Sequence, residues 1–527
     1  MFAKFLDQHH GLLQLLLLGV GTVLVYFLYN VVTNLFFHHF AKIPGPKLWA
    51  ATRLRFVVSL LSGNLVHDVR KIHERYGEIV RLAPDEISFA KEEAWHDIFG
   101  IRTGHKPFSK NPIYFSPPPG QPHNIVTTAN VDDHARMRRV LNYAFTPTAL
   151  KAQEPIIESY VDLLISRLKE KAISTQENHG DSAVLNMVDW YNYVAFDIVG
   201  DLGFGEPLNC LKEGVLHPWV AMIFNFIKGM TLAASTRYYP WLEFILMRFL
   251  VPESILKMAE DLYQLALDNI HRRMNLEQQR KDFMTPVLDQ GILNAGEEGK
   301  GMTMPEIEST FSMLIIAGSE TVGSTLSGIT YYLIQTPFAL EKLNREIRHA
   351  FTEESQITIT ALKEFLYLNA VIQEGLRLCN PVPAGLPRVV PQGGDTVCGV
   401  YLPGGTNVSV HPWTINNSPS FFRSPEDFIP DRWLPLAADS TNGSDIELKR
   451  PAEHANDHLS AIYPFSLGPR TCIGKGLALA ELRLILARLV WAFDLGVPEG
   501  QKGLDWRTLK TFIIVQKEPV WVRLRIR

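Results

Sequence analysis

Near the C-terminal end of the chain, one cysteine lies in a turn that contains glycine. The residues from Phe465 to Gly474 read FSLGPRTCIG, and a long apolar pattern typical of a helix follows from Lys475. Cys472 therefore lies beside a predicted helix N-terminus, whose free N–H groups and dipole favour a thiolate, the form that binds metals. A free cysteine is also often a small buried hydrophobic residue, so the turn alone leaves metal ligation and plain packing open.

The other cysteines offer no alternative metal site. They stand at positions 210, 379 and 398 and form no CxxC pair. Their spacing indicates neither a zinc site nor a disulfide framework. The formal charge of the 527 residues is -4, and the basic clusters are short, which argues against nucleic-acid binding.

A second group of reactive side chains lies inside a long apolar segment, where Ala317 to Thr321 reads AGSET. Glycine weakens a helix interior by about 1 kcal/mol, so Gly318 requires a reason. Two interpretations stay open at this point. Either Thr321 bonds back to its own backbone at a kink, or Glu320 and Thr321 form a polar pair that transfers protons.

Charged residues also recur at helical spacing. Glu374 and Arg377 are three positions apart, which places them on one face of a helix. A surface ion pair of this kind stabilises a protein by less than about 1 kcal/mol. His134, Arg138 and Arg388 are, taken singly, ordinary solvated basic residues.

Taken together, and in the order in which they occur along the chain, these motifs resemble those of the cytochrome P450 superfamily. The stretch Phe465-x-x-Gly-x-Arg470-x-Cys472-x-Gly474 resembles its haem-binding signature. The resemblance implies that Cys472 is the axial thiolate ligand of haem b. It also implies that Arg470 pairs with a propionate, that Phe465 packs near the sulfur, and that Gly474 lets the backbone approach the cofactor.

The resemblance assigns roles to the other charged residues as well. Glu374 and Arg377 are similar to the family's E-x-x-R motif, which pairs with a later arginine, here Arg432, and braces the cysteine loop. This role is structural. The further cations expected to hold the propionates are His134, Arg138 and Arg388.

In the same family, the helix that carries AGSET crosses the haem. Glu320 and Thr321 are then expected to be the catalytic pair that feeds protons to the site of oxygen activation. Val322 departs from the pattern, because many members have Thr or Ser there.

The N-terminus predicts a membrane anchor. No charged residue occurs from Gly11 to Phe37, a run longer than the apolar region of a cleaved signal peptide. Lys42, Lys47, Arg53 and Arg55 follow this run, which predicts a cytosolic catalytic domain at the endoplasmic reticulum membrane and no glycan on the Asn442 sequon. The expected division is a tail (1–10), a transmembrane anchor (11–37), a proline-rich elbow (38–50) and a haem-thiolate catalytic domain (51–527).

Helical periodicity dominates the rest of the chain, and the expected fold is mainly α with small β-sheets, the cytochrome P450 fold preceded by one transmembrane helix. A polar stretch at 437–456 is expected to be a disordered insert. The predicted helices are 153–172, 253–277, 304–335, 360–378 and 476–493, and the predicted strands are 79–82 and 520–526.

The expected function is that of a membrane-anchored haem-thiolate monooxygenase. It would insert oxygen from O2 into a lipophilic small molecule. The chain looks most similar to fungal microsomal enzymes of secondary metabolism, so the small molecule is expected to be an intermediate of that metabolism. NADPH would supply electrons through a reductase, with cytochrome b5 as a further candidate partner. Substrate contacts are expected from 112–131, 313–317, 384–386 and 511–514, with 222–249 as a membrane-dipping gate. Two alternatives remain, a haem-thiolate isomerase or dehydratase without O2 activation and a non-enzymatic membrane-anchored binding protein.

Overall fold

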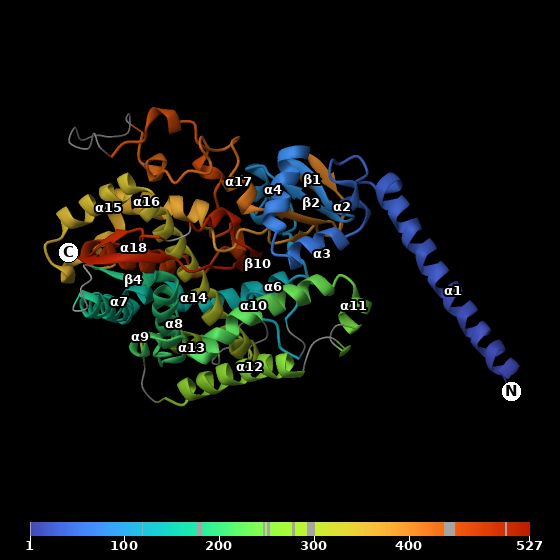
Figure 1. Cartoon of the computed structure of the whole chain (residues 1–527), viewed down its shortest axis with the longest axis horizontal. Coiled ribbons are helices and arrows are strands. Elements are labelled where there is room, and N and C mark those ends of the chain that lie inside the picture. The colour runs from blue at the N-terminus through green and yellow to red at the C-terminus, as the bar shows by residue number, and fades with distance from the viewer. Residues whose placement is uncertain are drawn as a thin grey trace.

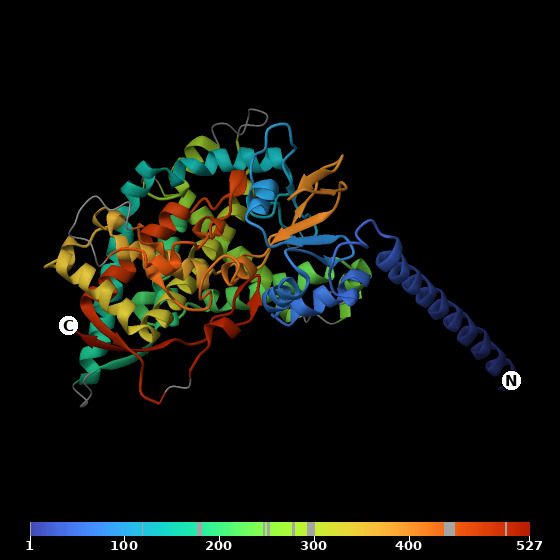
Figure 2. The ribbon, with the colours of Figure 1, turned by 90° about the horizontal axis from the view of Figure 1, so that it is seen from above.

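Helices make up most of the molecule, and small sheets lie at its edges (Figure 1). The helix α1 leaves the globular body and carries the N-terminus away from it, as both views show (Figures 1 and 2). This is a computed structural model, and it describes residues 2–117, 120–176, 182–245, 248–249, 253–276, 280–291, 301–436, 448–500 and 503–527.

The described α-helices range from one turn to more than thirty residues. They are α1 (Phe2–Val32), α2 (Lys47–Ala51), α3 (Leu54–Leu61), α4 (Leu65–Tyr76), α5 (Glu93–Phe99), α6 (Val131–Asn142), α7 (Pro147–Gln176), α8 (Met187–Phe204), α9 (Cys210–Glu213), α10 (Pro218–Thr236), α11 (Pro240–Ile245), α12 (Glu253–Met274), α13 (Met284–Gly291), α14 (Met304–Gln335), α15 (Pro337–Ala350), α16 (Leu366–Leu378), α17 (Pro412–Asn416) and α18 (Lys475–Ala492).

In the described part of the chain, the strands form four small sheets. They are β1 (Ile79–Ala83), β2 (Glu86–Phe89), β3 (Ser109–Lys110), β4 (Ala183–Asn186), β5 (Arg388–Val389), β6 (Asp395–Val397), β7 (Val400–Leu402), β8 (Asn407–Val410), β9 (Phe493–Gly496), β10 (Thr511–Phe512), β11 (Ile514–Val515) and β12 (Trp521–Ile526). The largest sheet has the order β1-β2-β8-β5-β3, in which only β2 and β8 run parallel. A second sheet has the order β4-β12-β9, and two hairpins pair β6 with β7 and β10 with β11.

The predicted mainly α fold is confirmed, including a long central helix at 304–335 that coincides with α14. The prediction of a disordered insert at 437–456 is wrong for the last part of this range. Residues 437–447, with the Asn442 sequon, lie outside the described residues, but Ala452–His454 forms a 3₁₀ turn and His454 is buried.

Close packing of α14 against α8 forms the centre of the core, and glycine makes it possible. A Cβ atom on Gly318 of α14 would lie 3.0 Å from Cγ2 of Val199 on α8, tighter than ordinary contact. Five residues further along, a Cβ on Gly323 would lie 2.8 Å from Oδ1 of Asn192. Gly318 thus has a packing role in addition to any role at a ligand.

The segment after α1 is tied to the body by backbone contacts. Pro44 O accepts from Arg81 N of β1 at 2.8 Å, and a Cβ on Gly45 would lie 2.6 Å from Arg81 O. The part of the expected elbow (38–50) that precedes α2 therefore runs against the sheet, and α2 begins within it at Lys47.

Candidate active site

The loop that carries Cys472 is held in place by its own backbone. Cys472 N donates to Phe465 O at 2.8 Å, and Thr471 Oγ1 donates to the same carbonyl at 3.1 Å. Gly468 has φ +73°, and a Cβ there would strike Phe99 O at the end of α5. Only glycine fits this turn, because an added side chain would push the loop away from α5.

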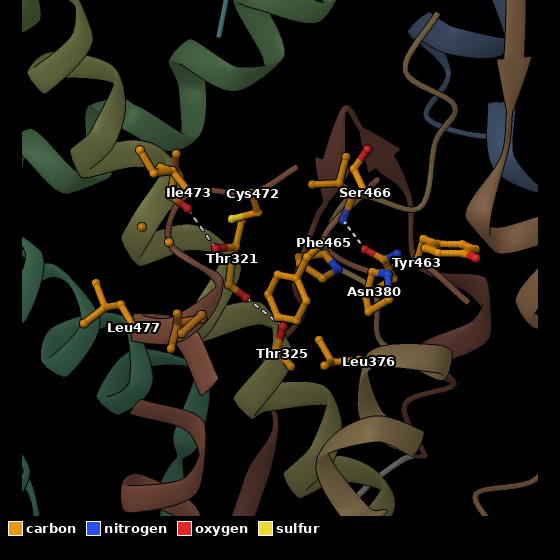
Figure 3. Close-up of a pocket in the computed structure, with 18 of the residues that line it drawn as sticks. Thr321, Thr325, Leu376, Asn380, Tyr463, Phe465, Ser466, Cys472, Ile473 and Leu477 are labelled. Atoms are coloured by element: carbon orange, nitrogen blue, oxygen red, sulfur yellow. Dashed lines mark hydrogen bonds between the residues drawn. The ribbon is translucent and has the colours of Figure 1, made fainter. Parts of the chain in front are cut away.

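Cys472 faces a cavity of about 340 Å³ that also reaches α14 (Figure 3). Thr321 and Gly318 line it from α14, opposite the cysteine loop. Gly474 lines it beside Cys472, and a Cβ on Gly474 would meet no atom within 4 Å. The loop can therefore come close to a flat group in this space. Apolar side chains form most of the remaining wall, among them Val126, Phe145, Val199, Phe283, Leu314 and Leu386.

The pKa of the Cys472 thiol differs from the expectation that the helix N-terminus would lower it. Its side chain is exposed to the cavity, but protein atoms enclose it on the other sides, and this burial raises the pKa of the thiol. The backbone at Gly474 and the cations Arg138 and Lys475 act in the opposite direction but do not outweigh burial. The helix N-terminus alone therefore does not produce a thiolate, and a bound metal would have to supply the remaining stabilisation.

The side chains of Glu320 and Thr321, which were expected to act as a pair, have different surroundings in the structure. Thr321 lines the cavity, and its Oγ1 donates to Ala317 O at 2.8 Å. Glu320 is not among the cavity-lining residues; it is 2% exposed, and its Oε2 accepts from Lys517 Nζ at 2.5 Å. Val322 also lines the cavity and contributes an apolar side chain there.

Five basic side chains gather beside the cavity. Burial and neighbouring cations lower the pKa of His134 to about 3, and burial with Arg470 lowers that of Arg388 to about 9. Lys110 faces Arg388 across the β3–β5 pair, and burial lowers its pKa well below the usual value. Arg138 donates to Thr471 O at 2.6 Å, and Arg470 to Thr128 O at 2.8 Å. His134 is therefore neutral at pH 7, and the crowding of the other basic groups favours an anion between them.

Comparison with known proteins identifies the family. Residues 43–521 match the family model of cytochrome P450. The chain is 39% identical over 502 residues to the cytochrome P450 monooxygenase astJ of Aspergillus oryzae, with 95% of each chain covered. This chain belongs to the cytochrome P450 family. It is also 37% identical over 506 residues to the cytochrome P450 monooxygenase lcsI of Purpureocillium lilacinum, covering 95% of this chain and 92% of the relative.

A third relative of this cytochrome P450 is the averantin hydroxylase of Dothistroma septosporum. The two are 36% identical over 512 residues, covering 97% of this chain and 91% of the relative. The expectation of a monooxygenase is thereby confirmed, and the non-enzymatic interpretation finds no support.

The side chains around the cavity of this cytochrome P450 fit haem. A thiol faces the cavity, and haem carries two propionates that would meet the basic cluster. Nη1 of Arg388 is buried and has no hydrogen-bond partner among the described residues, so it is a donor in need of an acceptor. Phe465, Arg470 and Gly474 all line the same cavity as Cys472.

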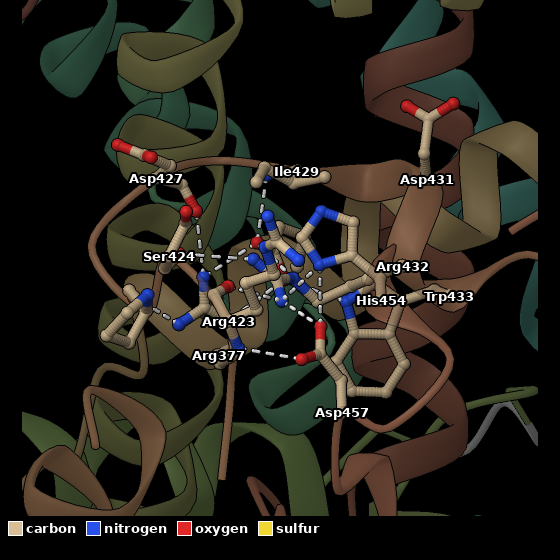
Figure 4. A network of polar contacts seen from close by, with 12 residues as sticks. Arg377, Arg423, Ser424, Asp427, Ile429, Asp431, Arg432, Trp433, His454 and Asp457 are labelled. Carbon is tan, nitrogen blue, oxygen red and sulfur yellow. Dashed lines mark hydrogen bonds and ion pairs between the residues drawn. The ribbon is translucent and has the colours of Figure 1, made fainter. Parts of the chain in front are cut away.

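The structure brings Glu374, Arg377 and Arg432 together in a fully buried network. Figure 4 shows Arg377 and Arg432 within it. Glu374 accepts from Arg377 at 2.7 Å and from Arg432 at 3.1 Å, and Arg432 also pairs with Asp457. Burial opposes ionisation of Glu374, but the two arginines hold its pKa below the usual value. Trp433 Nε1 donates to the same carboxylate at 2.8 Å. This network joins α16 to the turn at Pro430–Trp433.

Sequence reasoning missed several residues at the site. Thr325, one helical turn after Thr321, lines the cavity and could have been found from the four-residue spacing. Lys110 and Glu481 belong to no motif that pointed to them. Of the expected substrate segments, 511–514 contributes no residue to the cavity wall; its hairpin instead lies behind it, where Val515 N donates to Pro381 O at 3.1 Å.

Proposed function

We propose that Cys472 ligates haem iron as a thiolate and that this enzyme inserts oxygen from O2 into a lipophilic small molecule. The observation that carries the proposal is a single apolar cavity lined by Cys472 on one side and by Thr321 on the other. Haem bound there supplies the reduction of O2 and the oxygen transfer, with electrons from NADPH through a reductase.

The protein's own residues hold the cofactor and manage protons. Arg138, Arg388 and Arg470 neutralise the two propionates, the uncharged His134 offers them a hydrogen bond, and Arg388 gains the acceptor that its Nη1 lacks. Thr321 offers a hydroxyl inside the cavity, which can turn from Ala317 O toward a bound group. Glu320 supplies the acid of the pair after a change of side-chain orientation.

The wall of the cavity indicates the class of substrate. Phe145, Phe283 and Leu314 offer apolar surface, and Asn380 is one of few polar side chains there. Such a wall selects a largely apolar molecule and excludes water from the reaction. Because the similar enzymes are fungal monooxygenases, one of them named averantin hydroxylase, we place the substrate among fungal secondary-metabolite intermediates.

The same proposal includes a membrane anchor. Leu17–Phe37 has a mean hydropathy of 1.6 and is not buried in the protein. The exposed Trp241 and Phe244 of α11 lie at the end of the body from which α1 departs (Figures 1 and 2). Both features support attachment of this end to the endoplasmic reticulum membrane, with the catalytic domain in the cytosol.

The decisive experiment is the spectrum of the reduced protein with carbon monoxide. Wild type is expected to show the red-shifted Soret band of thiolate-bound haem, and Cys472→Ala to lose it. Cys210→Ala and Cys398→Ala are matched controls that should keep the band. A thiolate-type spectrum in Cys472→Ala would refute the assignment.

Reductase dependence separates the monooxygenase from an isomerase or dehydratase, which would turn over without NADPH. Comparison of metabolites with the gene present and deleted then identifies the substrate. Product formed without NADPH and reductase would contradict the proposal.

A further inference from the structure

A phenol and an imidazole are hydrogen-bonded at the edge of the cavity. Tyr463 lines the cavity together with Phe465 and Cys472 (Figure 3). Its hydroxyl oxygen lies 3.0 Å from Nε2 of His96, an exposed residue of α5, and the two rings meet edge-on with centroids 5.8 Å apart. Tyr463 therefore contacts both the cavity and a base that reaches solvent.

A second oxidisable ring lies beside Tyr463. Trp95 also lines the cavity, and its ring centroid is 5.3 Å from that of Tyr463. The Nε1 atom of Trp95 is buried and has no hydrogen-bond partner among the described residues, so no base stands ready to take the indole proton. Of the two rings, Tyr463 is the one that can lose a proton together with an electron, because His96 can accept that proton.

The charges around the pair suit such a transfer. Burial and the carboxylate of Glu92 raise the pKa of Tyr463, so the phenol keeps its proton at neutral pH until an electron leaves. Glu92 stands four residues before His96, so the two share one face of α5, and the carboxylate favours a positive imidazole. On the other side Glu92 lies 3.7 Å from Nδ1 of His458. An imidazole takes and returns a proton near pH 7, unlike any other side chain here.

We propose that Tyr463 is a redox-active tyrosine that carries single electrons between the protein surface and the cofactor cavity, with His96 as its proton acceptor. The inference rests on the proposed haem site. When a hydroperoxide oxidises the loaded enzyme in the absence of substrate, Tyr463 gives one electron to the oxidised cofactor and its hydroxyl proton moves to Nε2 of His96. A neutral tyrosyl radical and an imidazolium result.

An external reductant such as ascorbate completes the cycle. It returns one electron to the tyrosyl radical, and His96 returns the proton, which restores Tyr463. Two such rounds, with two protons from ascorbate and solvent, reduce one molecule of hydroperoxide to an alcohol and water. The pair thus adds a peroxide-reducing activity and removes oxidising equivalents from the cavity when no substrate is bound.

The first test detects the radical itself. Haem-loaded, substrate-free protein is mixed with cumene hydroperoxide, frozen rapidly and examined by electron paramagnetic resonance. Wild type should show a tyrosyl radical, and Tyr463→Phe, which keeps the ring beside Trp95, should lose it. Tyr401→Phe is the matched control and should keep it, because Tyr401 is 63% exposed and is not among the residues that line the cavity.

A variant of His96 tests the proton transfer. His96→Gln keeps a hydrogen-bond acceptor for the hydroxyl but cannot take its proton, so the radical should form about a hundredfold more slowly. His105→Gln, which alters a half-exposed histidine paired with Asp395 away from the cavity wall, should leave the rate unchanged. A radical that persists in Tyr463→Phe, or that forms equally fast in His96→Gln and wild type, would overturn the inference.

The second test measures bleaching of haem by the hydroperoxide. Ascorbate should slow bleaching of wild type three- to tenfold and should have little effect on Tyr463→Phe. Equal protection of the two proteins would contradict the proposed electron path.

An oxidant that needs no haem separates this inference from the proposed function. Flash-generated ruthenium(III) tris-bipyridine should produce a tyrosyl radical in the full-length protein, and the part of the signal that Tyr463→Phe removes should also be lost in His96→Gln. That result without a thiolate-type carbon monoxide spectrum would refute the role of Cys472 and leave the Tyr463–His96 pair standing. An unchanged signal in both variants would refute the pair, whatever the spectrum shows.

Discussion

At the scale of single residues, Glu481 is the most unusual group beside the cavity. It lies on α18, lines the cavity, and is fully buried, and neither carboxyl oxygen has a hydrogen-bond partner among the described residues. Burial alone raises its pKa to about 8. At neutral pH this carboxyl is therefore protonated in the folded protein, whereas in the unfolded chain it is ionised.

This difference predicts how stability depends on pH. Between the unfolded pKa of 4.5 and the folded value of about 8, the folded state holds one proton more, so stability falls as pH rises through this window. Each pH unit costs about 1.4 kcal/mol, or about 3 kcal/mol at pH 7. Glu481→Gln removes this penalty and should match wild type at pH 4.5 but exceed it at pH 7, as measured by chemical unfolding.

The exposed Glu341 provides the control, because Glu341→Gln should show no such pH-dependent gain. A constant difference between Glu481→Gln and wild type from pH 4.5 to pH 8 would contradict the raised pKa.

At the scale of elements, the Glu374 network connects α16 to the turn that precedes the cysteine loop. One carboxylate accepts from Arg377, Arg432, Trp433 Nε1 and the backbone N of Ile429. Arg377 in turn donates to the backbone carbonyls of Asn416 and Pro425. Removal of the carboxylate would leave buried guanidinium groups without their shared counter-charge.

We therefore expect Glu374→Gln to lower the free energy of unfolding by about 3–5 kcal/mol and to weaken haem retention. The matched control is Arg345→Gln, which breaks an exposed ion pair with Glu341 and should cost less than about 0.5 kcal/mol. Haem content and chemical unfolding of both variants check this. A Glu374→Gln protein as stable as the control would show that the network does not brace the fold.

The helix α14 shows which features could be predicted from sequence and which could not. Apolar periodicity and a Thr303–Glu306 capping box mark the start of α14, so the helix was predictable from local sequence. The orientation of Glu320 was not. Neighbouring helix residues point about 100° apart, so Thr321 can face the cavity while Glu320 faces α8. The partner that decides this, Lys517, lies 197 positions away in sequence.

At the scale of the whole molecule, fewer basic residues than the sequence indicated can set the orientation of the protein in the membrane. Arg53 is buried and pairs with Asp85 and Glu86, each at 2.5 Å, so it does not act as a free positive charge beside the membrane. Lys42, Lys47 and Arg55 remain on the side that follows the apolar helix. From sequence alone, all four basic residues carried equal weight, because the burial of Arg53 depends on tertiary contacts that no local pattern reveals.

The junction between anchor and body also limits where the chain can be cut. Arg81 is 1% exposed, and its Nη1 donates to Asn34 O at 2.8 Å. Phe40 is 4% exposed and packs into the cluster around β2 and β8. A chain that begins at Ala41 lacks both the acceptor of Arg81 Nη1 and the Phe40 side chain, whereas one that begins at Thr33 keeps them.

We expect the chain 33–527 to retain the haem spectrum of the full-length protein and to leave the membrane fraction more readily. The chain 41–527 should also bind haem but be less stable by about 3–6 kcal/mol, because a buried donor loses its partner and a core aromatic ring is deleted. Chemical unfolding of the two truncated proteins measures the difference, and Phe40→Ala in the chain 33–527 separates the aromatic contribution from that of Asn34. Equal stability of the two chains would mean that the elbow only tethers the body to the membrane and contributes nothing to its packing.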